Sequence, residues 1–163
     1  GLILAPTREL AIQIGDELRS LLTYYQGIRV AVLYGGAGIV GQAKQLEKKP
    51  QIVVATPGRL MDHYNRKNIR LDKIQTVVLD EADRMLDMGF INDIRKILSM
   101  LPPVRQNLFF SATMPSDIVA LAKSILSKDY ETIEVAPTFT PVERISQKVY
   151  HVDKRQKGLL FRE

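Results

Sequence analysis

Short apolar runs alternate along this chain with stretches in which apolar residues recur at helical spacing. Five of these runs are predicted to be strands, and a sixth, Thr132–Val135, is a weaker candidate. Because the runs are continuously apolar rather than alternating, they are typical of a parallel sheet that is buried on both faces. The five are Leu2–Ala5, Ile28–Tyr34, Gln51–Ala55, Thr76–Asp80 and Asn107–Ser111.

Amphipathic stretches fill the intervals between the predicted strands. A regular alternation of strands and helices favours an α/β fold with helices on both faces of the sheet. The predicted helices are Arg8–Tyr25, Ile39–Lys49, Pro57–Arg66, Asn92–Leu101 and Asp117–Ser127.

The pattern changes towards the C-terminus. Pro137 and Pro141 bracket a β-branched, extended segment that is typical of a linker. Beyond it, Ile145–Val152 alternates like a new strand, and a helical pattern starts at Lys154. Both ends of the sequence fall within such patterns, so we interpret the chain as a piece of a longer protein. The predicted organisation is a domain over residues 1–136, a linker over 137–144 and the start of a second domain over 145–163.

Composition narrows the classes of protein. The chain has no cysteine, which excludes disulfides and thiolate metal sites, and the two histidines, His63 and His151, are interpreted as surface or packing residues. No apolar stretch approaches the roughly 20 residues of a membrane span, and no signal peptide is visible, so a cytoplasmic location is expected. The 23 basic and 18 acidic residues give a net charge of +5, which mildly favours a polyanionic partner.

Polar or glycine-containing motifs follow each of the five predicted strands. In an open parallel sheet, ligands bind beyond the carboxyl ends of the strands, so the sequence predicts one site at one edge. In chain order the motifs are Pro6–Ala11, Gly35 and Gly36, Thr56–Leu60, Asp80–Asp83, and Ser111–Thr113.

The acids after the fourth strand suit a nucleotide-hydrolysing site. Asp80 is placed to face the hydrated Mg²⁺ of a bound nucleotide, and Glu81 to orient the attacking water. For this run alone, a strand followed by a solvated acidic turn is an equal alternative. Ser111 and Thr113, at the end of the neighbouring run, are expected to hydrogen bond back to the acids.

Two predicted helix starts suit phosphate groups. Thr56 is a good N-cap and Pro57 fits the first helical position, which leaves the N–H groups of Gly58 and Arg59 free and adds a charged fork. Taken alone, this pattern also describes an ordinary helix start with a surface arginine. Thr7–Glu9 repeats the design, and two such starts on one edge can grip a nucleic-acid backbone without reading bases.

The glycine run Gly36–Gly41 has the form G-x-G-x-x-G after a predicted strand. A dinucleotide-binding fold also needs an acid at the end of the next strand, and Gln51–Ala55 ends without one. A flexible turn that lets backbone approach backbone is the favoured interpretation. A dinucleotide-dependent oxidoreductase is the weaker alternative.

The motifs PTRELA, GG, TPGRL, DEAD and SAT occur together in the order and spacing of the first domain of DEAD-box RNA helicases. This chain resembles that family over nearly its whole length, including the continuation at Arg84–Phe90. The segment Ile145–Leu160 and the linker are most similar to the bacterial RhlE-type subgroup. The resemblance implies a RecA-like parallel sheet of the P-loop NTPase type, a three-layer sandwich truncated at its N-terminus. It also implies a two-domain motor that couples ATP hydrolysis to unwinding of short RNA duplexes.

The resemblance further implies a role for each motif residue. Asp80 would hold Mg²⁺ through water, Glu81 would activate the attacking water, and Asp83 would contact the second domain. Ser111 and Thr113 would couple the state of ATP to duplex separation. ATP and Mg²⁺ are the implied cofactors, and the RNA backbone, bound with little sequence preference, is the implied partner. The implied RNA contacts are Pro6, Thr7, Arg8, Gly35, Gly36, Thr56, Pro57, Gly58 and Arg59.

Parts of the family pattern are absent from this sequence. It contains no G-x-x-x-x-G-K-S/T loop and no Gly-Lys pair, and it lacks the adenine-reading glutamine motif and the arginine motifs of the second domain. We therefore expect that this chain alone neither binds ATP tightly nor hydrolyses it. We also expect marginal stability, with exposed apolar surface beside the Asp80 strand. A nucleic-acid-binding module without nucleotide turnover is the alternative function.

Overall fold

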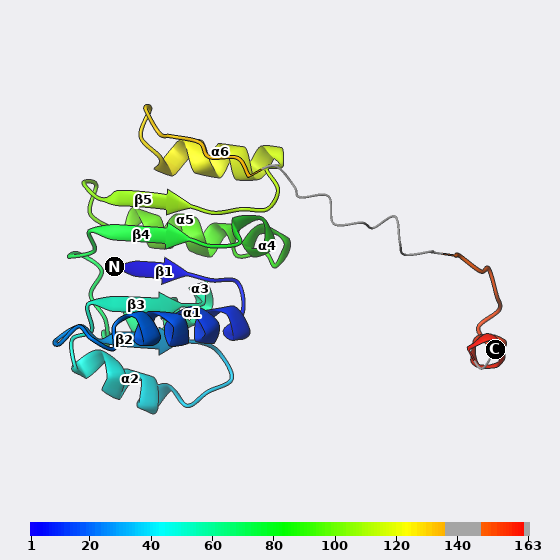
Figure 1. Cartoon of the computed structure of the whole chain (residues 1–163), viewed down its shortest axis with the longest axis horizontal. Coiled ribbons are helices and arrows are strands. Elements are labelled where there is room, and N and C mark those ends of the chain that lie inside the picture. Colours follow the sequence, from blue (N-terminus) through cyan, green and yellow to red (C-terminus); the bar gives the residue numbers. More distant parts are fainter. Residues whose placement is uncertain (136–147, 162–163) are drawn as a thin grey trace. The chain divides into compact units, whose positions relative to one another are not determined.

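The structure is a computed structural model that describes residues 1–135 and 148–161. It divides into two units, Gly1–Tyr130 and Glu131–Glu163. The first unit contains a sheet flanked by helices (Figure 1). The predicted linker over 137–144 lies outside the described residues, so the predicted domain boundaries stay predictions.

The sheet has five strands, all parallel, in the order β2-β3-β1-β4-β5 (Figure 1). The prediction of a parallel α/β sheet is therefore confirmed. Leu4 is in register with both Ala55 and Leu79, and Leu79 with Phe109, so the strands end level with one another. The bounds are β1 Leu2–Leu4, β2 Val30–Leu33, β3 Ile52–Ala55, β4 Thr76–Leu79 and β5 Gln106–Phe109.

Six helices connect or follow these strands. The five predicted helices are present, but each ends earlier than expected, and the short helix α4 directly after the acids was not predicted. The C-terminal turn predicted for α1 is a loop in which Tyr24 is 92% exposed, so its apolar residues have no core to pack against. The bounds are α1 Arg8–Leu21, α2 Ile39–Glu47, α3 Pro57–Asn65, α4 Ala82–Asp87, α5 Ile91–Ser99 and α6 Ser116–Ile125.

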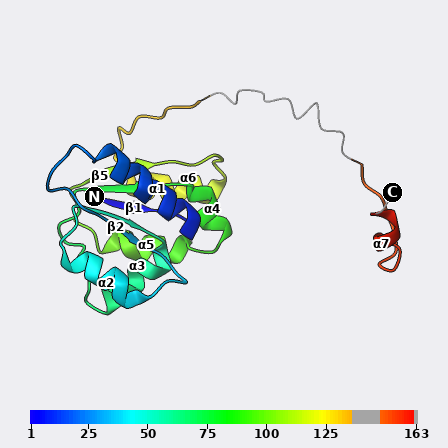
Figure 2. The ribbon, with the colours of Figure 1, turned by 60° about the horizontal axis from the view of Figure 1, so that its bottom comes forward.

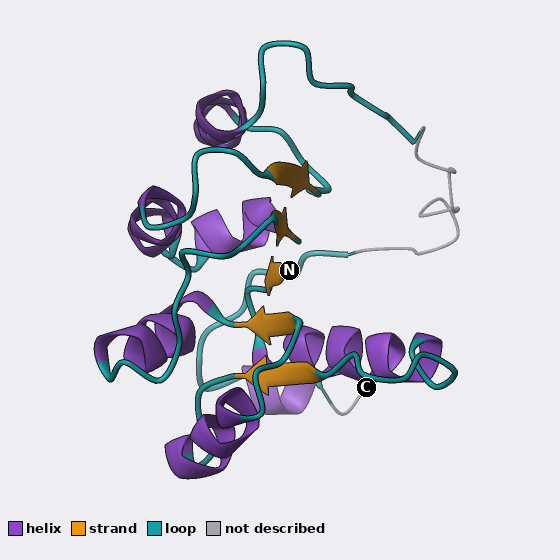
Figure 3. Cartoon of the chain, turned by 90° about the vertical axis from the view of Figure 1, so that its left-hand side faces the viewer, coloured by secondary structure: helices purple, strands orange, loops and turns teal. Residues whose placement is uncertain are grey.

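Helices cover both faces of the sheet, as Figure 3 shows along the strand direction. One face packs against α1, through a small cluster in which Ala11 meets Val32 and Val54. The opposite face holds the larger core, built with residues of α3, α5 and α6 (Figure 2). The α1 layer lies very close to β2, because a Cβ atom on the buried Gly15 would sit 2.4 Å from a methyl group of Val32. None of the helices in the described ranges has the length and apolar character needed to span a membrane.

The weak strand prediction is wrong, and a second strand prediction is not supported by the part of it that the structure describes. Thr132–Val135 forms no strand, and neither does Lys148–Val152, the described part of the predicted strand Ile145–Val152. The side chains of Ile133 and Val149 are more than four-fifths exposed, so their alternating pattern is not supported by burial of one face. The helix expected from Lys154 begins later, as α7, Lys157–Leu160.

Exposed apolar surface lies beside the Asp80 strand, as expected. The Asp80 strand, β4, is hydrogen bonded to β1 on one side and to β5 on the other. The neighbouring strand β5 is the last strand of the sheet; Leu108 in it is 37% exposed, and Phe110 directly after it is 54% exposed. The expectation of marginal stability stays a prediction.

Candidate functional site

The level strand ends bring all five motifs to one edge of the sheet. Along that edge the glycine pair follows β2, the TPGR start follows β3 and the PTRE start follows β1. The acids after β4 and the SAT segment after β5 come next. The three phosphate-binding candidates are therefore contiguous, and the acids lie beside the hydroxyl groups.

Asp80 and Glu81 form a tight turn between β4 and α4. The Asp80 N–H continues the sheet by donating to the Leu4 carbonyl at 3.0 Å, and the Glu81 N–H donates to Asp80 Oδ1 at 3.0 Å. Glu81 then adopts a left-handed backbone conformation, with φ 49° and ψ 53°. A non-glycine residue rarely occupies this region, and such strain is typical of functional turns.

The Asp80 carboxylate suits a hydrated divalent cation. Burial raises its pKa above the ordinary value; the hydrogen bond from the Glu81 amide lowers it, and the Glu81 charge raises it. The surroundings therefore disfavour the charged form, and a cation at this position would offset that cost. Mg²⁺ is commonly bound through one or two carboxylates together with substrate phosphates and water, so Asp80 fits such a site.

Asp83 connects the acids to the SAT segment. Its Oδ2 accepts hydrogen bonds from both the amide and the hydroxyl of Thr113, each at 2.8 Å. The Asp83 N–H donates to Ser111 Oγ at 3.2 Å, and the Ser111 hydroxyl donates to the Thr113 carbonyl at 2.7 Å. The expected hydroxyl hydrogen bonds are thus present, and they converge on Asp83 rather than on Asp80 or Glu81.

These contacts set the charge state of Asp83. Burial works to raise its pKa, but the hydrogen bonds from the Thr113 hydroxyl and amide and from the Arg84 amide outweigh burial and hold the pKa below its ordinary value. The carboxylate is therefore ionised across the physiological range. The end of β4 and the SAT segment are joined by an ionic hydrogen-bonded cluster.

Arg8 and the glycine pair lie together. The Arg8 guanidinium stacks over the Tyr34 ring, with 5.0 Å between the guanidinium carbon and the ring centroid. Gly36 has a positive φ of 78°, and a Cβ atom there would lie 3.5 Å from Arg8 Nη1. The start of α1 and the loop after β2 thus form one continuous surface that includes Arg8.

The two threonine caps differ. Thr7 Oγ1 accepts a hydrogen bond from the Leu10 amide at 3.2 Å, as an N-cap does. Thr56 occupies the N-cap position of α3, with Pro57 in the first turn, but its side chain makes no capping hydrogen bond. A Cβ atom on Gly58 would meet nothing within 4 Å, so the N-terminus of α3 is open to a ligand.

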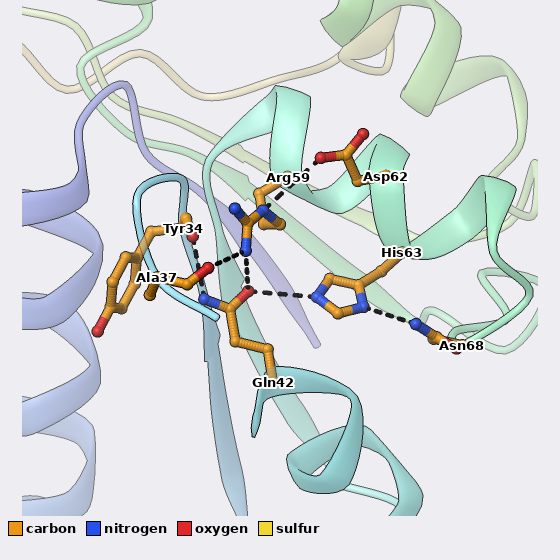
Figure 4. A network of polar contacts seen from close by, with 7 residues as sticks. All are labelled: Tyr34, Ala37, Gln42, Arg59, Asp62, His63 and Asn68. Atoms are coloured by element: carbon orange, nitrogen blue, oxygen red, sulfur yellow. Dashed lines mark hydrogen bonds and ion pairs between the residues drawn. The ribbon is translucent and has the colours of Figure 1, made fainter. Parts of the chain in front are cut away.

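The prediction that Arg59 offers an open charged fork is incomplete. Its side chain is only 12% exposed, and Nη1 donates to the Ala37 carbonyl at 2.9 Å and to Gln42 Oε1 at 3.2 Å (Figure 4). Its Nε lies 3.7 Å from an Asp62 carboxylate oxygen. Arg59 therefore ties α3 to the glycine loop, besides any contact with a ligand.

Sequence reasoning missed Gln42 and the role of His63. Both are buried, and they are the buried polar side chains in the described part of the chain. His63 was interpreted as a packing or surface residue, and it is indeed packed inside, hydrogen bonded to Gln42 and Asn68. A signal for Gln42 was available in the sequence. Gln42 lies four residues before Leu46, on the same buried face of α2, and a polar residue at such a position is unexpected.

A model of the family described as "DEAD/DEAH box helicase" matches residues 1–121. Among curated proteins, the chain is 47% identical over 157 residues to a protein of Listeria monocytogenes named ATP-dependent RNA helicase CshA. That match covers 94% of this chain and 30% of the relative, so the chain spans about a third of the relative's length. The subgroup assignment to RhlE-type proteins stays a prediction.

Solved structures agree with this likeness. A hypothetical ATP-dependent RNA helicase from Sulfolobus tokodaii matches with a TM-score of 0.74 and 38% identity, covering 80% of this chain and 38% of that one. The yeast DEAD-box splicing factor Prp28 matches with a TM-score of 0.75 and 34% identity, covering 77% of this chain and 30% of that one. Both matches support the RecA-like interpretation of the sheet.

Proposed function

This chain belongs to the DEAD/DEAH box helicase family, and on that basis we propose that it supplies the first motor domain of an enzyme that uses ATP to separate short RNA duplexes. The observation that carries the proposal is the arrangement of the edge. The acid strand and the SAT segment are joined through Asp83 and Thr113, directly beside three contiguous phosphate-binding candidates. Because the chain spans 30% of its relative's length, the activity belongs to a longer protein.

In this proposal the acid turn handles the nucleotide. Asp80 would hold Mg²⁺ through water, and Glu81 would position or activate the attacking water. Mg²⁺, when bound, would neutralise charge on the nucleotide phosphates. Asp83 would contact the second domain, and its bonds to Thr113 would pass the state of the acid turn to the SAT segment.

The other half of the edge would hold RNA. The open N-terminus of α3 presents backbone N–H groups to a phosphate, and Arg8 presents a cation beside the exposed glycine pair. Such contacts reach the sugar-phosphate backbone and leave the base edges unread, so little sequence preference is expected. The contacts proposed are Pro6, Thr7, Arg8, Gly35, Gly36, Thr56, Pro57, Gly58 and Arg59.

Substitution of Glu81 tests the nucleotide half. We use "full-length enzyme" for this chain within a protein of its relatives' length. In that enzyme, Glu81→Gln should lower RNA-stimulated ATP turnover by at least about 100-fold, the scale of a lost general base, while RNA binding in the presence of ATP is retained. Asp87→Asn is the matched control, because Asp87 is an exposed acid at the end of the same helix, and it should leave turnover unchanged.

The alternative is a nucleic-acid-binding module without nucleotide turnover. These 163 residues contain no Gly-Lys pair and hence no phosphate-binding loop, so they do not by themselves distinguish the two functions. The same measurements separate the two functions. A full-length protein that binds RNA but shows no ATP turnover would reject the motor, whereas turnover that survives Glu81→Gln would reject only the role proposed for Glu81. The dinucleotide-dependent oxidoreductase is not proposed, because the glycine run falls inside the region matched by the helicase family.

A further inference from the structure

We infer that Gln42 is a positioning residue for the RNA-binding half of the edge. Its side chain is buried, with 4% of the residue exposed, so it cannot itself contact RNA. It acts by fixing the glycine loop after β2 against the N-terminal turn of α3. This inference rests on the proposed function, since it names how two of the proposed RNA contacts are held in place.

The Gln42 amide bonds to three separate elements. Its Nε2 donates to the Tyr34 carbonyl, at the end of β2, at 3.0 Å. Its Oε1 accepts from Arg59 Nη1 in α3 at 3.2 Å, and lies 3.2 Å from His63 Nε2 one turn further along that helix. Figure 4 shows Gln42 reaching from α2 to these partners. One side chain thus joins α2, the end of β2 and α3.

The result is a loop that is held on both flanks. Gln42 binds the Tyr34 carbonyl just before the glycine pair, and Arg59 binds the Ala37 carbonyl just after it at 2.9 Å. Between these anchors Gly35 and Gly36 are exposed. Glycine loses more conformational freedom than any other residue when it is ordered, so an unanchored pair would sample many conformations. The two anchoring side chains, Gln42 and Arg59, are also hydrogen bonded to each other, so they hold the loop as one unit.

The donor and acceptor pattern fixes every group in this unit. Because Gln42 Nε2 donates to a carbonyl, its Oε1 must be the atom that faces His63, and His63 Nε2 must carry the proton. His63 Nδ1 then accepts from Asn68 Nδ2, at 3.0 Å. The neutral tautomer of His63 completes the set, and Gln42 can hold only one orientation. A polar network that is satisfied in this way favours a single geometry.

Substitutions at Gln42 distinguish the hydrogen bond made by its Nε2 from those made by its Oε1. Gln42→Leu fills a similar volume with an apolar side chain and removes the hydrogen bonds to Tyr34 and Arg59 together. Gln42→Glu keeps acceptors for Arg59 and His63 but has no N–H for the Tyr34 carbonyl, and it sets a negative oxygen against that carbonyl. Gln13→Leu is the matched control, because Gln13 is an exposed glutamine on α1.

The test is the RNA dependence of ATP turnover by the full-length enzyme, with an unstructured RNA oligonucleotide as the probe. For Gln42→Leu we expect the RNA concentration that gives half-maximal turnover to rise by at least about tenfold, the scale of losing hydrogen bonds to a charged group. Turnover at saturating RNA should be unchanged, which also shows that the variant is folded. Gln42→Glu should raise the same concentration by less than Gln42→Leu, and Gln13→Leu should not raise it.

A double substitution tests whether Gln42 acts through Arg59. If it does, Gln42→Leu combined with Arg59→Leu will raise the half-maximal RNA concentration by less than the product of the two single changes. An effect equal to that product would overturn the inference. So would a half-maximal RNA concentration for Gln42→Leu that equals that of Gln13→Leu. If Gln42→Leu does not fold, Gln42→Glu decides, and an unchanged RNA dependence in that variant overturns the inference.

Failure of the proposed function gives a different result. A wild-type full-length enzyme with no RNA-stimulated turnover would reject the motor. A wild-type enzyme that responds to RNA, with Gln42 variants that respond identically, would reject only the positioning role.

Discussion

The surroundings of the buried His63 imidazole favour its neutral form. Burial is the largest cause that lowers its pKa; the charges of Arg59 and Arg66 also lower it, and Asp62 opposes them. The hydrogen bonds point the same way, because a protonated ring would place an N–H against the amide group of Asn68 that now donates to it. His63 is therefore neutral in the folded state at neutral pH.

This charge state predicts a pH dependence of stability. The folded-state pKa lies below 6.5, so on acidification the unfolded state binds the proton first. The contribution of neutral His63 to the free energy of unfolding is fully present above the unfolded-state pKa. It is lost as the pH falls towards the folded-state pKa. The urea midpoint of this chain should fall more between pH 7.5 and pH 5.5 than that of His63→Leu. The exposed His151 provides a control, since His151→Leu should behave as the wild type does; equal losses in the wild type and His63→Leu would contradict the prediction.

At the residue scale, the sequence indicated motif chemistry more readily than side-chain geometry. The N-cap role of Thr7 was predictable, because a cap and its helix are neighbours in sequence. The ties of Arg59 were not, because its partners Ala37 and Gln42 lie on other elements, 22 and 17 residues away. The left-handed conformation of Glu81 was likewise unpredictable, since glutamate has no preference for that region.

At the scale of elements, the packing of α1 on β2 depends on one glycine. Gly15 is buried in the interior of α1, where glycine is otherwise unfavourable for a helix. The methyl group of an alanine would sit 2.4 Å from Val32 Cγ2, which is far inside van der Waals contact. The helix layer and the sheet would have to separate, or Val32 would have to change rotamer.

Gly15→Ala should therefore destabilise this chain by about 1–3 kcal/mol, because the cost of overpacking outweighs the gain in helix propensity. The matched control is Gly41→Ala in α2, where a Cβ atom meets nothing within 4 Å. That change should be neutral or should stabilise the chain by about 0.5–1 kcal/mol. Urea unfolding of the two variants measures the difference, and equal free energies of unfolding would show that α1 does not pack as closely as described.

The elements themselves were largely predictable from periodicity, and the errors have physical causes. Strands β1 to β4 were found because a strand that is buried on both faces needs a continuous apolar run; β5, which is only partly buried, was found with its bounds shifted. Thr132–Val135 has the same composition, but nothing buries it, and β propensity without burial does not make a strand. Helix α4 was missed because six residues are too few for a helical period to be recognised.

At the scale of the whole molecule, the common edge followed from the sequence, but the order of motifs along it did not. A parallel sheet places every strand end on one side, which the apolar runs already implied. That β1 lies between β3 and β4 is a tertiary fact, and it puts the PTRE start of α1 directly beside the acid turn. The Asp80 amide donates a hydrogen bond to the Leu4 carbonyl at this junction, where the proposed RNA half and the proposed nucleotide half of the edge meet.

This chain by itself is not expected to hydrolyse ATP. In the proposed function, the acids of the edge hold Mg²⁺ and position water. The sequence contains no loop to cradle the nucleotide phosphates, and phosphoryl transfer depends on positioning of those phosphates. The purified 163-residue chain should therefore show no ATP turnover, with or without RNA. Phosphate release is the measurement, and the Glu81→Gln form of the chain serves as the control for contaminating ATPases. Turnover that is present in the wild-type chain and disappears in its Glu81→Gln form would show that the acid turn hydrolyses ATP without a phosphate-binding loop. The prediction that the loop is required would then be wrong.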